Sequence, residues 1–140
     1  MINDKIKYNK YIPFKGFLLI NLYGTYYVNN RDKNITIHPF MLNHEAIHDA
    51  QANDINDLLY IKSKNFLWIG YTLYYIYYIL EYIIKLFLKI FNNKIKVYRS
   101  NSMEQEAYNN QNNEFYLKTR KSFANKKYIF KIINKTNERN

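Results

Sequence analysis

Apolar and aromatic residues are concentrated early in the chain, in residues 17–28, FLLINLYGTYYV. Such side chains favour β-strands. Residues 29–34 then supply a run of turn residues, and a short apolar run follows at residues 35–37. The pattern predicts a β-hairpin, with Gly24 as a candidate bulge.

Helical spacing begins at Pro39, whose fixed φ suits a first helical turn. From there apolar residues recur at roughly helical spacing, at Phe40, Ile47, Ala50, Ile55, Leu58, Leu59 and Ile61. We therefore expect the first long helix to begin near Pro39.

Residues 66–91 form a second and far more apolar stretch, whose first fifteen residues carry no charge. Glu81, Lys85 and Lys89 follow one another at four-residue intervals, so a helix here has one polar stripe and a broad apolar face. Two interpretations are open. The apolar face could pack as a wall of the core, or it could attach to or partly enter a membrane.

A third helix is expected near Met103, because Ser102 and Gln105 have the spacing of a capping box. The expected fold is a small α+β domain with an N-terminal β-hairpin and about three main helices. We place the domain at residues 1–117 and a basic C-terminal segment at residues 118–140.

The chain has 140 residues, enough for one modest core, and no cysteine. Disulfides, cysteine zinc sites, iron–sulfur clusters and thiol nucleophiles are therefore excluded, and a metal must be bound by His, Asp or Glu. The first residues lack the apolar core of a secretory signal, so we expect an intracellular protein, with peripheral or partial membrane insertion as an option.

The formal charge of +10 lies mainly at the C-terminus, where eight basic residues and Glu138 give residues 118–140 a charge of +7. Such a segment attracts anionic lipid headgroups or nucleic acid phosphates without specificity. No nucleic-acid reader motif is present, so we expect no specific nucleic-acid recognition.

The sequence His44-Glu45-Ala-Ile-His48 lies inside the first expected helix. Histidines four residues apart project from one face of a helix and can share a cation. Glu45 lies about 100° around from His44, where a carboxylate can act as general base on a water molecule without binding the metal itself.

A catalytic zinc site usually has three protein ligands and one open position. His38 lies at or before the start of the helix, so it is expected to be a capping or loop residue, with a role as ligand or cleft residue left as the alternative. The acidic candidates are Glu104 and Glu106 on the third expected helix.

HExxH followed by a later helix with a glutamate resembles the gluzincin branch of zinc metallopeptidases. The stretch Glu104-Gln-Glu106-Ala-Tyr108 resembles the E-x-E-A-D stretch of HtpX-like and CAAX prenyl proteases. The resemblance implies one zinc ion held by His44, His48 and Glu104, with Glu45 as the base. Residues 15–117 also resemble small uncharacterised metallopeptidase-like proteins of Bacteroidetes and their phages.

Tyr108 departs from this pattern, because the family has an aspartate there that orients a ligand histidine. Its hydroxyl could take over that role or assist catalysis at the oxyanion, or the ring could simply pack. Gln51 could support the site or be a solvated helix residue, and Glu106 points to the other side of its helix. The resemblance also places a strand near residues 35–37 along the substrate cleft.

The leading functional hypothesis is a zinc-dependent endopeptidase acting on a peptide or protein substrate. The alternative is a non-catalytic zincin-like protein that binds a membrane, a nucleic acid or a virion component. An anionic membrane surface is a candidate partner through residues 66–91 and the basic segment.

Overall fold

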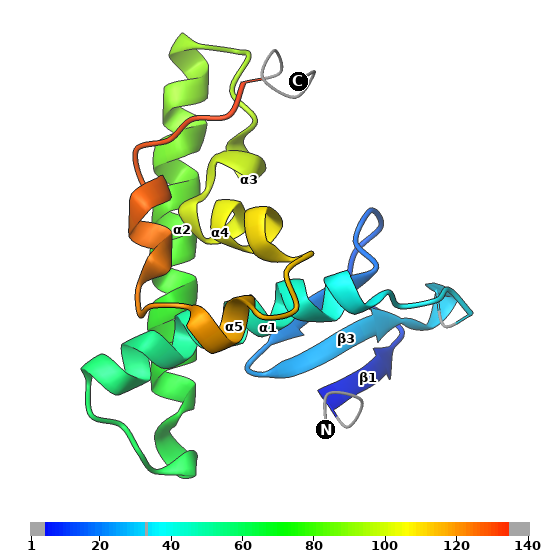
Figure 1. The fold of residues 1–140 in the computed structure, drawn as a ribbon. Helices are drawn as coiled ribbons and strands as arrows, with labels where there is room; N and C mark the ends of the chain where they lie inside the picture. Colours follow the sequence, from blue (N-terminus) through cyan, green and yellow to red (C-terminus); the bar gives the residue numbers. More distant parts are fainter. Residues whose placement is uncertain (1–4, 33, 135–140) are drawn as a thin grey trace.

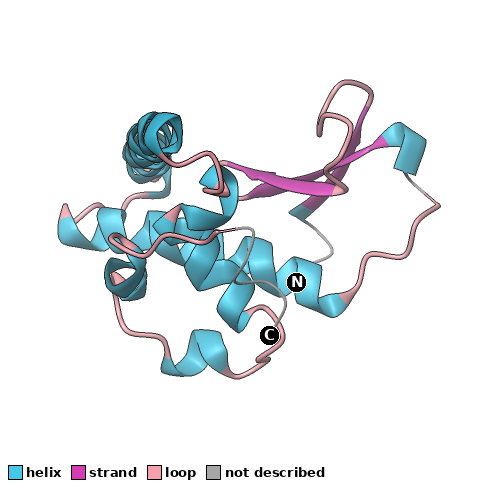
Figure 2. Ribbon diagram, turned by 90° about the horizontal axis from the view of Figure 1, so that it is seen from above, coloured by secondary structure: helices cyan, strands magenta, loops and turns pink. Residues whose placement is uncertain are grey.

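The computed structural model describes residues 5–32 and 34–134. A small three-stranded sheet lies along one side of helix α1 (Pro39–Leu58), and the long helix α2 (Trp68–Phe91) crosses the end of α1 (Figure 1). Viewed nearly along α2, the sheet and α1 extend together away from it (Figure 2). The expected α+β class is confirmed.

The sheet has the strand order β1 (Ile6–Asn9), β3 (Thr25–Asn29), β2 (Leu19–Leu22). β2 and β3 form an antiparallel hairpin, and β1 pairs with β3 in parallel. β2 is therefore an edge strand, and its outer edge lies on the side away from β1.

The expected position of the hairpin turn is wrong. The chain reverses at Tyr23 and Gly24, where φ is +50° and +76°, and not at residues 29–34. Two positive φ values give a turn whose twist matches that of the flanking strands. Gly24 is thus a turn residue and not a bulge, Asn30–Asp32 form a 3₁₀ turn, and residues 35–37 form no strand.

The side chain of Asp49 links α1 both to the sheet and to α2. This buried carboxylate accepts hydrogen bonds from Lys5, which directly precedes β1, from Asn21 on β2, from Tyr26 on β3 and from Tyr71 on α2. Four donors compensate for the burial of its charge. α1, which carries His44, Glu45 and His48, is therefore held in a fixed position against the sheet and α2.

The connection from α1 to α2 depends on Asn56 and Gly70. The amide of Asn56 accepts from the Gly70 N–H at 3.2 Å and donates to the Leu67 carbonyl at 3.1 Å. Gly70 has no Cβ, which leaves the space that the Asn56 side chain occupies. A short 3₁₀ turn, Lys64–Phe66, precedes this contact.

Two more helices, α3 (Val97–Ser100) and α4 (Ser102–Asn110), pack on α1 and α2. The third long helix begins where it was expected, but not with the expected cap. Asn101 is the N-cap and accepts from the Met103 N–H, whereas both the N–H and the hydroxyl of Ser102 donate to Glu81. A buried carboxylate on α2 thereby fixes the start of α4.

The C-terminal segment packs against the rest of the domain through α5 (Tyr116–Thr119) and the 3₁₀ helix η4 (Ala124–Tyr128). Arg120 forms a buried ion pair with Asp54 of α1, and Lys85 of α2 donates to the Ile129 carbonyl. The boundary at residue 117 stays a prediction. Residues 135–140, at the end of the expected basic segment, lie outside the described residues.

Two of the three charged residues of the α2 stripe, Glu81 and Lys85, face the domain, whereas Lys89 is exposed. This orientation is the reverse of the core-wall interpretation. Glu81 and Lys85 are buried, while the apolar residues on the other side of the helix are exposed. Among the described residues, no helix combines the length and the hydrophobicity needed to cross a membrane.

Candidate metal centre

Three side chains that could hold a metal ion converge between α1 and α4. His44 and His48 lie one turn apart on α1, and Glu104 approaches from the first turn of α4. The Nε2 atoms of the two histidines are 3.1 Å apart. Glu104 oxygens lie 3.4 Å from His44 Nε2 and 3.5 Å from His48 Nε2, and the three ligand atoms all lie within 4.8 Å of one another.

Two side chains contact Nδ1 of His48 and orient its ring: Gln51, one turn further along α1, and Tyr74 of α2, whose hydroxyl lies 3.0 Å away. The amide nitrogen of Gln51 donates to the Met103 carbonyl and to Glu106, so its oxygen must be the atom that faces His48 Nδ1 at 2.8 Å. That oxygen can only accept, so Nδ1 carries the proton. In the neutral ring, Nε2 then presents its lone pair to the centre.

His44 is oriented in the same way from α4. Its Nδ1 lies 3.0 Å from the side-chain oxygen of Gln111, which follows the last turn of that helix. Its ring also packs edge-on against Tyr108, with the centroids 4.6 Å apart. Gln111 thus makes the contact that was considered for the Tyr108 hydroxyl, and the Tyr108 ring supports the histidine by packing.

Glu104 is buried and receives a 2.9 Å hydrogen bond on one carboxylate oxygen from the hydroxyl of Tyr78. Burial raises the pKa of this carboxyl, but the nearby His48 and His44 outweigh burial and hold the pKa below its usual value. The other oxygen, Oε2, is buried and has no hydrogen-bond partner within the described part of the chain.

Glu45 lies beside this group and lines the same cavity as His44, His48 and Glu104. Burial raises the pKa of the Glu45 carboxyl, and the positive potential of His48 and His44 offsets only part of this rise. A carboxylate with a raised pKa is a better proton acceptor and donor near neutral pH than an exposed one.

The cavity has a volume of about 310 Å³ and mostly apolar walls. One wall is the edge strand β2, a second is the loop that carries Phe14 and Phe17, and a third consists of α2 tyrosines. The strand that borders the cleft is therefore β2. The expectation that residues 35–37 form that strand is wrong, because the hairpin turn comes earlier in the chain.

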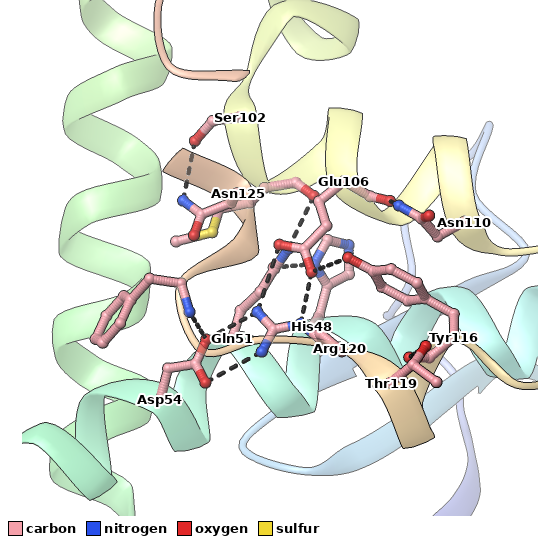
Figure 3. Close-up of polar contacts among 12 residues, drawn as sticks. His48, Gln51, Asp54, Ser102, Glu106, Asn110, Tyr116, Thr119, Arg120 and Asn125 are labelled. Atoms are coloured by element: carbon pink, nitrogen blue, oxygen red, sulfur yellow. Dashed lines mark hydrogen bonds and ion pairs between the residues drawn. The ribbon is translucent and has the colours of Figure 1, made fainter. Parts of the chain in front are cut away.

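The other predicted site residues take different positions. Gln51 contacts a ligand directly, as described. Glu106 lies one step further away, fully buried, and accepts hydrogen bonds from Gln51, Tyr116 and Arg120 (Figure 3). His38 is the N-cap residue of α1, stacks on Phe40 and lies outside the metal-ligand group.

Several residues at this site were missed by sequence reasoning. Tyr74 and Tyr78 contact His48 and Glu104, but nothing distinguished them among sixteen tyrosines. Arg120 was assigned to the basic segment, and Gln111 was given no role. Asp49 could have been found, because it directly follows His48 in the first expected helix. A charged residue buried at such a position requires hydrogen-bond partners.

Comparison with known proteins adds nothing to this geometry: no protein-family model, no curated protein and no solved structure matches the chain. The residues themselves therefore carry the functional argument. They form a buried His44, His48 and Glu104 group that could bind a metal ion.

Proposed function

We propose that this protein is a zinc-dependent endopeptidase with His44, His48 and Glu104 as metal ligands and Glu45 as general base. The observation that carries the proposal is the convergence of the three ligand atoms within 4.8 Å, beside a glutamate that lines the same cavity. This is the arrangement that the resemblance to gluzincins implies.

The donor atoms fit a cation. His48 Nε2 presents a lone pair, and His44 Nε2 does the same when its Nδ1 donates to Gln111. When both rings are neutral in this way, two lone pairs face each other 3.1 Å apart, and a Glu104 oxygen without a hydrogen-bond partner adds a negative charge nearby. A cation between them would relieve both the repulsion of the lone pairs and the uncompensated charge.

Zinc is the metal proposed because two histidines and one glutamate, with a fourth position open, are the ligands of hydrolytic zinc sites. When bound, zinc supplies positive charge that polarises the scissile carbonyl and acidifies water.

The protein's own groups supply the remaining chemistry. Glu45 accepts the proton of the attacking water and delivers it to the leaving amine. The apolar cavity binds a substrate side chain and excludes bulk water. The outer edge of β2 borders the cavity and can pair with an extended substrate backbone.

The test measures metal content and cleavage on the same preparations. The wild type and Glu45→Gln should each bind one zinc per chain, while His48→Ala should lose it. Cleavage of a mixed peptide library, read by mass spectrometry, should fall roughly 10²- to 10⁴-fold in Glu45→Gln. Full cleavage by Glu45→Gln, or a wild type without stoichiometric metal, would contradict the proposal.

The second candidate is a non-catalytic zincin-like binding protein. The exposed apolar face of α2 favours it, because this surface is separate from the metal centre and needs no catalysis to act. Stoichiometric zinc without any cleavage of the peptide library would support this candidate over the first.

A further inference from the structure

α2 exposes a broad apolar surface. Successive helical residues are about 100° apart, so six exposed apolar positions of its second half lie roughly 100° to 300° around from Glu81. These side chains are between 37% and 74% exposed: Tyr82, Ile83, Ile84, Leu86, Phe87 and Ile90. We call them the outer face of α2. An arc of this width is wider than the stripe that a surface helix normally buries.

The inner face of α2 explains why the helix nevertheless folds in this orientation. Glu81 is 6% exposed and accepts two hydrogen bonds from Ser102. Lys85 is 3% exposed, lies 3.7 Å from Glu81 and donates to the carbonyls of Ile129 and Lys131. These charged groups are satisfied by α4 and the C-terminal segment, so α2 cannot turn its polar stripe toward solvent without losing them.

Positive charge accompanies this apolar surface. The segment that Lys85 binds runs beside α2 (Figure 1) and carries exposed Lys126, Lys127 and Lys131. Phe130, in the same segment, is 94% exposed. Residues 118–134 contain no acidic residue. A basic segment with an exposed aromatic residue next to an apolar helix is complementary to anionic lipid headgroups over acyl chains.

We propose that the outer face of α2, with Lys126, Lys127, Lys131 and Phe130, binds the surface of an anionic lipid bilayer. α2 lies along the interface, because α1 and α3 pack against its inner side. A single partner helix would cover a narrow seam and leave most of the arc in water, and it would not account for the lysines. The proposal is independent of zinc binding and of catalysis.

The fluorescence of Trp68 reports binding to lipid vesicles. Trp68 is the only tryptophan in the chain, it is 55% exposed, and its helical position falls within the arc of the outer face. Vesicles of phosphatidylcholine alone are compared with vesicles that also contain phosphatidylglycerol, by flotation and by tryptophan emission. We expect the protein to float with the anionic vesicles with a blue shift of Trp68, and high salt to reduce this binding without abolishing it.

The variant Ile83→Glu with Phe87→Glu places two charges in the outer face at positions already 54% and 59% exposed, so the fold should tolerate them. It should lose flotation. The matched control is Ile35→Glu with Phe40→Glu, which changes two exposed apolar residues, one in the loop before α1 and one in its first turn. The start of α1 lies far from α2 (Figure 1), so this variant should bind like the wild type.

Four results would overturn the proposal: no flotation of the wild type, full release by high salt, unchanged flotation of the α2 variant, or equal loss in the control. The main competing explanation is that the outer face of α2 contacts a second copy of this chain, and sedimentation without vesicles tests it. If the wild type does not float but forms a dimer, and the α2 variant is a monomer, the outer face is such a contact.

Discussion

Gln51 holds His48 by its Nδ1 atom, at 2.8 Å, and is itself held by Glu106, whose carboxylate it reaches at 3.1 Å. Arg120 and Tyr116 bind the same carboxylate. The orientation of a candidate metal ligand thus depends on residues from α1, α4 and the C-terminal segment.

Replacing Gln51 by Ala should lower zinc affinity about 10- to 100-fold, because His48 loses the acceptor that fixes its tautomer. Zinc affinity is measured by competition with a chelator. Gln105→Ala is the matched control: this buried glutamine binds the carbonyls of Ser100 and Lys131 and contacts no candidate ligand. Equal affinity losses in both variants would show that Gln51 acts only through stability.

Replacing Arg120 by Met should destabilise the protein by about 3–5 kcal/mol, since the buried carboxylates of Asp54 and Glu106 would lose their cation. Urea unfolding measures the loss. Lys62→Met removes an exposed ion pair with Asp57 and should cost less than about 1 kcal/mol. Similar losses in both variants would contradict the buried network.

Replacing Gly70 by Ala should cost about 1–3 kcal/mol, because the added Cβ would overlap the Asn56 side chain. The same substitution in an Asn56→Ala background should cost clearly less, since the overlapping atoms are gone. A double-mutant cycle by urea unfolding gives this coupling. Additive effects would mean that the two residues do not compete for space.

Alkaline pH should destabilise the protein partly through Tyr75, whose hydroxyl donates to the Asn21 carbonyl of β2. Burial raises the pKa of Tyr75 from 10.0 to about 12. Between these values the unfolded chain has released the proton and the folded chain retains it, so the free energy of unfolding falls as pH rises. Tyr75→Phe should show a shallower decline in urea unfolding; parallel curves would argue against the shift.

The two long helices and two of the three candidate metal ligands follow from the sequence, because periodic apolar residues over 39–58 and 68–91 and a four-residue histidine spacing are local signals. Glu104 required a resemblance, because its approach to His44 depends on how α4 packs on α1. The parallel pairing of the short strand β1 with β3 could not be predicted, because no local sequence pattern indicates it.

The orientation of α2 could not be predicted, for a different reason. Periodicity shows that Glu81 and Lys85 share a face, but it does not show whether that face meets water or protein. The answer depends on Ser102 and on backbone carbonyls near Ile129, which no local pattern identifies as partners.

The chain has no cysteine, and the three candidate ligands come from helices that lie far apart in the sequence. A metal ion bound to His44, His48 and Glu104 would therefore tie α4 to α1 as a cross-link does, closing a long loop that contains all of α2. Folding and metal binding would then be thermodynamically linked. The free metal concentration would therefore set part of the free energy that holds α4 against α1.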